Sequence, residues 1–158
     1  MTGRAEVERL RRHLDATFQR IKGLPASVDL EIQSDFARYL CVLVSGYLEK
    51  SVSELVLEHA RRKGSPTLQR FVEGSTRRFA NANMERVLTL LGSFDPDWRR
   101  DLESVLAVEH KDAVNSVVGL RNNIAHGGMA GVTYQRIAEY YVQVQHVVER
   151  IAAICGVA

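Results

Sequence analysis

The sequence predicts an all-α fold: an up-and-down helical bundle with two or three long helices and short connecting helices. Apolar residues recur at steps of three and four along nearly the whole chain, which is the spacing of one helix face. No segment alternates apolar and polar residues as a half-buried strand does. Helix-stopping glycines, and capping residues followed by proline, divide the chain into segments. With 46% apolar residues among 158, residues 1–158 are expected to form one domain with its own core.

The first two segments predict long helices. The first ends at Gly23-Leu24-Pro25, a glycine stop followed by a proline. Its apolar stripe consists of Val7, Leu10, Leu14, Phe18 and Ile21. The second begins between Ser27 and Ser34 and ends before Gly64, after a basic run that suits the carboxyl end of a helix dipole. Its stripe consists of Phe36, Tyr39, Leu40, Leu43, Tyr47, Leu48 and Leu55.

Short helices are expected between residues 64 and 108. Ser65-Pro66 is a capping residue followed by proline, and it opens a helix that passes Leu68 and Phe71 and ends near Asn81. Asp95-Pro96 repeats this signal. A helix between these two has the apolar residues Val87, Leu88, Leu90 and Leu91, and the helix after Pro96 has Trp98, Leu102, Val105 and Leu106.

Two further helices complete the prediction. One begins near His110 and is stopped by Gly127-Gly128; its apolar positions are Val114, Val117, Val118, Ile124 and Ala125. Thr133 caps the last helix. The apolar positions of that helix alternate between steps of three and four, which suits close packing. They are Tyr134, Ile137, Tyr141, Val144, Val148, Ile151 and Cys155.

The composition excludes several classes of protein. The net charge is only +2, so no strong overall field attracts nucleic acid or membrane. No apolar run approaches the ~18 residues that a membrane span needs. The first residues are too charged for the core of a signal peptide, so a cytoplasmic location is expected. In that reducing compartment Cys41 and Cys155 are expected to be buried thiols.

Sequence patterns of the common catalytic and metal sites are absent. The chain has no Gly-Lys step for a phosphate loop, no His-Glu-x-x-His, no Cys-x-x-Cys and no Gly-x-Ser-x-Gly. The five histidines lack the spacing of metal ligands, and we interpret His13, His59 and His146 as structural or solvated. No metal ion and no cofactor are therefore expected.

The segment from Arg121 to His126 departs from the helical pattern. Arg121 falls near the middle of the apolar arc that includes Val114 and Val117, where an unpaired guanidinium would be costly. His126 occupies the last turn, where an imidazole is able to take and give a proton. An arginine and a histidine at one helix end form a set that suits phosphate chemistry, because the arginine can hold a phosphate oxygen while the histidine moves a proton.

The neighbouring polar residues leave two interpretations open. In the functional one, Asn122 or Asn123 orients the imidazole, since they precede His126 by four and three residues. In the structural one, Arg121 forms a buried salt bridge with Glu54, which lies close to the apolar stripe of the second helix, and His126 only caps its helix.

Residues Arg121-Asn122-Asn123-Ile124-Ala125-His126 resemble the Arg-polar-x-x-x-His motif of HEPN (higher eukaryotes and prokaryotes nucleotide-binding) domains, and with Leu120 and Gly127 they resemble the RiboL-PSP branch in particular. The order of the helices is similar over most of the chain. The resemblance implies a metal-independent endoribonuclease whose two protomers form one composite cleft. It assigns phosphate stabilisation to Arg121, proton transfer to His126 and positioning to Asn122.

The resemblance has one departure. Family members that are paired with nucleotidyltransferase antitoxins carry a modified tyrosine two residues after the histidine, where this chain has Gly128. Regulation by modification at that position is therefore not expected. We expect an RNA-cleaving homodimer of a toxin or antiviral-defence system, with an antitoxin or another regulatory protein as a possible partner. A non-catalytic module that binds RNA, nucleotides or a protein is the alternative, and a DNA-binding helical protein is a weaker one.

Overall fold

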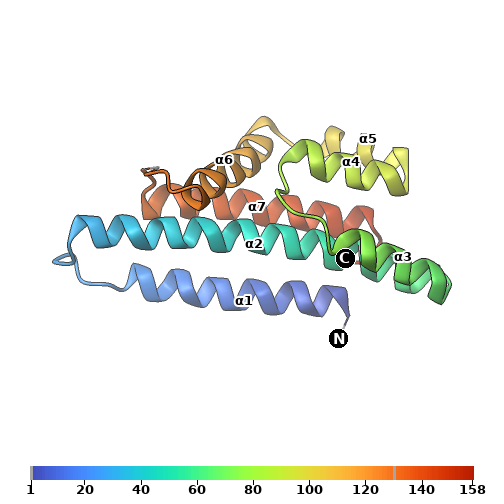
Figure 1. Cartoon of the computed structure of the whole chain (residues 1–158), viewed down its shortest axis with the longest axis horizontal. Helices are drawn as coiled ribbons and strands as arrows, with labels where there is room; N and C mark the ends of the chain where they lie inside the picture. The colour runs from blue at the N-terminus through green and yellow to red at the C-terminus, as the bar shows by residue number, and fades with distance from the viewer. Residues whose placement is uncertain (1, 130) are drawn as a thin grey trace.

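The structure is a computed structural model that describes residues 2–129 and 131–158. These residues form seven α-helices and contain no strand. The helices are α1 (Gly3–Lys22), α2 (Leu30–Lys63), α3 (Pro66–Thr76), α4 (Met84–Phe94), α5 (Pro96–Val105), α6 (Val108–Ala125) and α7 (Tyr134–Ile154). Figure 1 shows α1, α2 and α7 as long helices side by side, with α4, α5 and α6 above α7 and α3 at the right-hand end of α2. The predicted all-α bundle is therefore confirmed.

Most helices begin at a residue whose side chain caps them. In each case a hydroxyl, carboxylate or amide oxygen accepts a hydrogen bond from one of the first backbone N–H groups, which have no partner inside the helix. These residues are Thr2, Asp29, Ser65, Asn83, Asp95 and Thr133. Helix α6 begins at Val108, two residues before the predicted start, because Nδ1 of His110 accepts the N–H of Ala107 at 3.0 Å.

The core surrounds α2, which contacts α1, α3, α6 and α7. Because several helices cover it, α2 is buried on more than one face. Its fully buried residues include Leu40, Val44, Leu48, Val52 and Leu55. The predicted seam of α7 is confirmed except at its first position, since Tyr134 is only partly buried. The other predicted residues, Ile137, Tyr141, Val144, Val148, Ile151 and the capping residue Cys155, are all buried.

Two expectations about the apolar pattern were wrong. Tyr39 was placed on the buried stripe of α2, but 53% of it is exposed. The third helix was expected to run to about Asn81 and ends at Thr76, and its apolar residues Leu68 and Phe71 are exposed. The reason in each case is that periodicity finds the apolar face of a helix but not the length over which a neighbour covers it.

Both cysteines are buried thiols, as predicted. The Sγ of Cys41 lies 3.6 Å from the carbonyl oxygen of Val117, and this contact joins α2 to α6. Burial disfavours the charged thiolate. It raises the pKa of Cys41 to about 11 and that of Cys155 to about 12.

The start of α1 packs closely on the second half of α2. A Cβ on Gly3 would collide with the backbone oxygen of Glu54 and the Cβ of Glu58. The N–H of Gly3 donates to Oε2 of Glu58 at 3.1 Å, and Nε of Arg62 donates to Oε1 at 3.0 Å. These bonds, with that from Gly3 as the largest cause, hold the pKa of Glu58 below its ordinary value. The stability that Glu58 contributes is therefore present above its unfolded pKa and is lost as the pH falls.

Candidate functional site

The candidate site lies at the carboxyl end of α6, where the sequence places Arg121 and His126. The middle of α6 is fixed by Val114, Val117 and Val118, which are buried against the other long helices. The burial ends before the helix does, since Arg121 is partly buried and Ala125 is exposed. The predicted apolar arc of α6 is therefore buried in the core along its first half and accessible to solvent at its carboxyl end.

The end of α6 is closed by a Schellman motif. Gly127 has a φ of +80°, a conformation in which glycine avoids the strain of a side chain. Its N–H donates to the oxygen of Ile124 at 3.1 Å, and the N–H of Gly128 donates to the oxygen of Asn123 at 2.8 Å. His126 is the capping residue before Gly127, and its side chain is exposed. The two glycines thus fix His126 at the rim of the helix end.

Gly128 stands where the subgroup described above carries a tyrosine, and the structure shows what a side chain there would meet. A Cβ on Gly128 would overlap the side-chain amide of Asn123. The Asn123 amide therefore fills that space.

Arg121 is a partly buried cation with one side-chain hydrogen-bond partner among the described residues. Its Nη1 donates to Oδ1 of the adjacent Asn122 at 3.3 Å. Within residues 2–129 and 131–158 its guanidinium forms no ion pair. A guanidinium has five N–H donors, so most of its hydrogen-bonding capacity is available to an anion.

The predicted salt bridge between Arg121 and Glu54 is not formed. Glu54 lies near Arg61, with 4.0 Å between the carboxylate and the guanidinium. The physical reason is that Glu54 lies further along α2 than either point at which the motif region is joined to that helix. Val117 of α6 contacts Cys41, and the motif reaches Glu49 through Asn81, whereas Glu54 follows Glu49 by more than one helical turn. Glu54 therefore does not support the interpretation of Arg121 as one half of a buried salt bridge.

Asn122 connects the motif to the segment between α3 and α4. Its Nδ2 donates to Oδ1 of Asn81 at 2.7 Å. The backbone N–H of Asn81 donates in turn to Oε1 of Glu49, on α2, at 2.8 Å. Hydrogen bonds therefore join Arg121 through the side chain of Asn122 to the side chain of Asn81, and the backbone of Asn81 is in turn bonded to a carboxylate on the central helix.

Within the described residues, neither predicted partner of His126 is hydrogen-bonded to its ring. The amide of Asn122 is used by Arg121 and Asn81, and the amide of Asn123 lies against Gly128. In the part of the chain that the structure describes, no hydrogen bond joins the imidazole to either residue. Asn122 is therefore hydrogen-bonded to the arginine and not to the histidine.

Sequence reasoning did not identify Asn81 and Glu49. Asn81 lies 41 residues from its partner Asn122, and no pattern in the sequence joins the two. The one local signal is the residue type, because asparagine is among the few residues that tolerate the left-handed region, where the structure places Asn81 with a φ of 58°. The sequence could therefore have predicted Asn81 as a turn residue between two helices. It could not have predicted that Asn81 contacts the motif.

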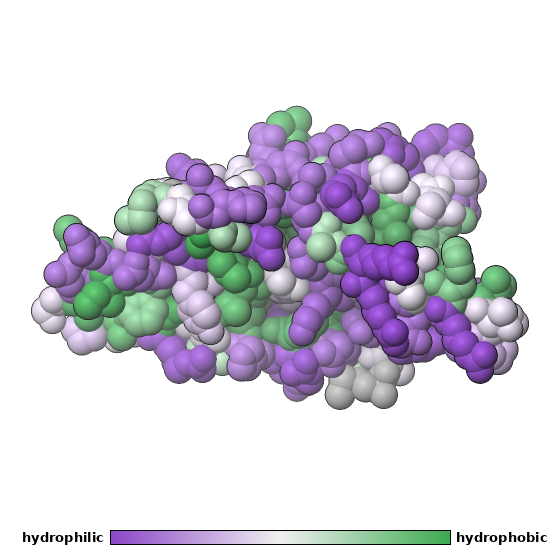
Figure 2. All heavy atoms as spheres, viewed as in Figure 1, coloured by the Kyte–Doolittle hydropathy of each residue, from purple (hydrophilic) through white to green (hydrophobic). Residues whose placement is uncertain are grey.

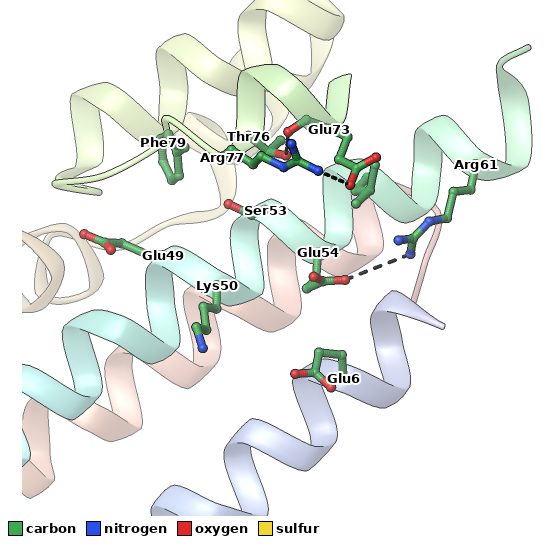
Figure 3. A pocket seen from close by; sticks show the side chains of 11 residues that line it. Glu6, Glu49, Lys50, Ser53, Glu54, Arg61, Glu73, Thr76, Arg77 and Phe79 are labelled. Carbon is green, nitrogen blue, oxygen red and sulfur yellow. Dashed lines mark hydrogen bonds and ion pairs between the residues drawn. The ribbon is translucent and has the colours of Figure 1, made fainter. Parts of the chain in front are cut away.

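A charged groove lies between α1, α2 and α3 (Figure 3), and Glu49, which accepts the N–H of Asn81, is one of its lining residues. Figure 3 shows Glu54 directed toward Arg61, and Arg77 toward Glu73. Neither Arg121 nor His126 lines it. Its acidic and basic side chains largely neutralise one another, so its charge does not favour a polyanion.

Among residues 2–129 and 131–158, no three His, Cys, Asp or Glu side chains are grouped as metal ligands would be. None of the described helices combines the length and the hydropathy that crossing a bilayer requires.

Comparison with known proteins gives one match. The model of the RiboL-PSP-HEPN family matches residues 5–156, nearly the whole chain. No curated protein and no solved structure matches the chain.

Proposed function

The chain belongs to the RiboL-PSP-HEPN family, and from this membership and the geometry at the end of α6 we propose that it is a metal-independent endoribonuclease. HEPN domains are often ribonucleases. The observation that carries the proposal is Arg121, a partly buried cation that forms no ion pair within the described ranges and lies on the same helix end as an exposed histidine. Such a cation suits a bound phosphate.

In the proposed reaction the ribose 2′-oxygen attacks the adjacent phosphorus. The bond from phosphorus to the 5′-oxygen breaks, which leaves a 2′,3′-cyclic phosphate and a 5′-hydroxyl. The 2′-hydroxyl proton goes to a base, and the leaving 5′-oxygen receives a proton. His126 carries out proton transfer, Arg121 stabilises the added charge on the phosphate, and Asn122 positions Arg121.

We propose that two protomers share the site. One motif supplies one histidine, whereas the reaction needs a group that accepts a proton and another that donates one. Apolar surface is available near the motif: Met129 is 83% exposed and Leu30 is 79% exposed. A cleft lined by Leu30 and Val132 shows that the start of α2 adjoins the α6–α7 connection. Figure 2 shows apolar atoms on the surface at this end of the molecule.

The dimer is testable in solution. We expect a symmetric dimer that buries at least ~1,000 Å², with both copies of Arg121 and His126 opening into one groove. Light scattering at micromolar concentration should give twice the mass of 17.7 kDa. Replacing the exposed Met129 by glutamate should shift the protein toward the monomer. A wild-type monomer, or a dimer whose two His126 residues lie at opposite ends, would contradict the shared site.

The mechanism also predicts how activity depends on metal. Because His126 and Arg121 supply proton transfer and charge stabilisation, cleavage of RNA should continue at the same rate in EDTA. The assay follows a labelled RNA with and without the chelator and identifies the product ends. Loss of activity in EDTA that magnesium restores would contradict the mechanism. RNA binding without cleavage would favour the non-catalytic alternative.

A ribonuclease of this kind would arrest growth if it were unrestrained. We therefore propose that the protein is a toxin or antiviral-defence effector in the cytoplasm, and that an antitoxin or another regulatory protein restrains it.

A further inference from the structure

We propose that Asn81 is a positioning residue of the ribonuclease site: by holding the side chain of Asn122 in one orientation, it directs the guanidinium of Arg121 toward the substrate phosphate. This inference rests on the proposed function. Asn81 lies between α3 and α4, 40 residues before Arg121 in the sequence.

The hydrogen-bond chain has only one satisfactory direction. Arg121 has donors and no acceptor, so it must face an oxygen of Asn122. With Oδ1 of Asn122 so used, its Nδ2 faces Asn81 and needs an acceptor, which is Oδ1 of Asn81 at 2.7 Å. If either amide turned over, two donors would meet at Arg121 or at Asn81. Asn81 therefore makes the orientation of Asn122 that accepts from Arg121 the favoured one.

The backbone of Asn81 is itself held in place. Its N–H donates to Oε1 of Glu49 at 2.8 Å, and its carbonyl oxygen accepts the N–H of Asn83, also at 2.8 Å. Its φ of 58° lies in the left-handed region, which asparagine tolerates better than most residues. Glu49 belongs to α2, the helix at the centre of the core. The position of Asn81 is therefore set by the most buried element of the fold.

A second contact keeps this segment against α6. Oδ1 of Asn115 accepts the N–H of Met84 at 3.0 Å. Asn115 and Asn122 are seven residues apart, so they lie on the same face of α6, two turns apart. The segment before α4 is thus fixed to α6 independently of Asn81, and removing the Asn81 side chain should leave the segment in place.

Two substitutions of Asn81 distinguish the effect of its side-chain amide from the effect of its backbone conformation. Asn81→Gly keeps the left-handed conformation accessible and removes the acceptor for Asn122. Asn81→Asp keeps an acceptor oxygen at the same position and also tolerates the conformation. Asn83→Gly is the matched control: it removes an asparagine amide from the same segment, but that amide caps α4 through the N–H of Arg86 at 3.0 Å, and glycine is tolerated at a helix cap.

We expect Asn81→Gly to lower kcat about tenfold or more and to change KM little. The reason is that the reaction rate falls steeply when a catalytic group is misplaced. Asn81→Asp should keep kcat within about threefold of wild type, and Asn83→Gly should stay close to wild type, because the Arg121 partner is preserved in both. Thermal melts of all three should be similar. Wild-type kcat in Asn81→Gly, or an equal loss in Asn83→Gly, would overturn the inference.

Nuclear magnetic resonance gives a readout that does not need cleavage. In the wild type, the side-chain NH₂ protons of Asn122 and the Nη1 protons of Arg121 should exchange slowly with solvent, because both groups donate hydrogen bonds. Both effects should be lost in Asn81→Gly and kept in Asn83→Gly. If the wild type cleaves no RNA, the proposed function fails while these spectra still decide the inference, and unchanged Asn122 and Arg121 signals in Asn81→Gly would overturn it.

Discussion

Replacing Arg121 by alanine should lower the rate of RNA cleavage by on the order of 10²-fold or more while the fold survives. The loss follows because the guanidinium is the group that meets the charge developing on the phosphate. The fold should survive because, within the described residues, Arg121 forms no ion pair and contacts only Asn122 by hydrogen bond. Cleavage assays and thermal melts on the same preparations measure both quantities.

Two further variants sharpen this prediction. Arg121→Lys keeps the charge but not the planar pair of donors, so it should recover only part of the activity. Arg70→Ala is the matched control, since Arg70 is exposed on α3, outside the motif. A stability loss of ~3–5 kcal/mol in Arg121→Ala would indicate a buried structural charge instead, and wild-type cleavage would remove Arg121 from the mechanism.

Replacing His126 by alanine should lower cleavage by roughly 10²–10⁴-fold, the range that general acid–base catalysis contributes. The effect on stability should be within about 0.5 kcal/mol, because an exposed side chain outside the core contributes little. His126 closes α6 through its backbone N–H, which donates to the oxygen of Asn122 at 3.1 Å, and alanine retains that bond.

The control for His126 is another exposed histidine. His13 lies on α1, outside the motif, and His13→Ala should cleave RNA at the wild-type rate. The two variants are compared for cleavage, RNA binding and melting temperature. If His126→Ala still binds RNA and has lost only cleavage, the histidine acts in chemistry. If it cleaves as fast as the wild type, proton transfer must be assigned to another residue.

The sequence predicted those parts of the structure that depend on neighbours in the chain. The all-α fold, the buried seam of α7 and the end of α6 at Gly127 all follow from local rules of spacing and capping. The same rules placed Arg121 and His126 at one helix end. These features were predictable because periodicity and capping act over a few residues, and the tertiary structure did not override them.

Only the tertiary structure decided which distant residues meet the motif. The sequence suggested Glu54 as the partner of Arg121, whereas the fold places Glu54 near Arg61 and brings Asn81 to Asn122. Tyr39 shows the same limit, because its place on a helical stripe did not reveal that its side chain is exposed. A helical period fixes the direction of a side chain around its own axis. It carries no information on where another helix crosses that axis or on which loop is folded against it, and the packing of α2, α6 and the segment before α4 supplied both.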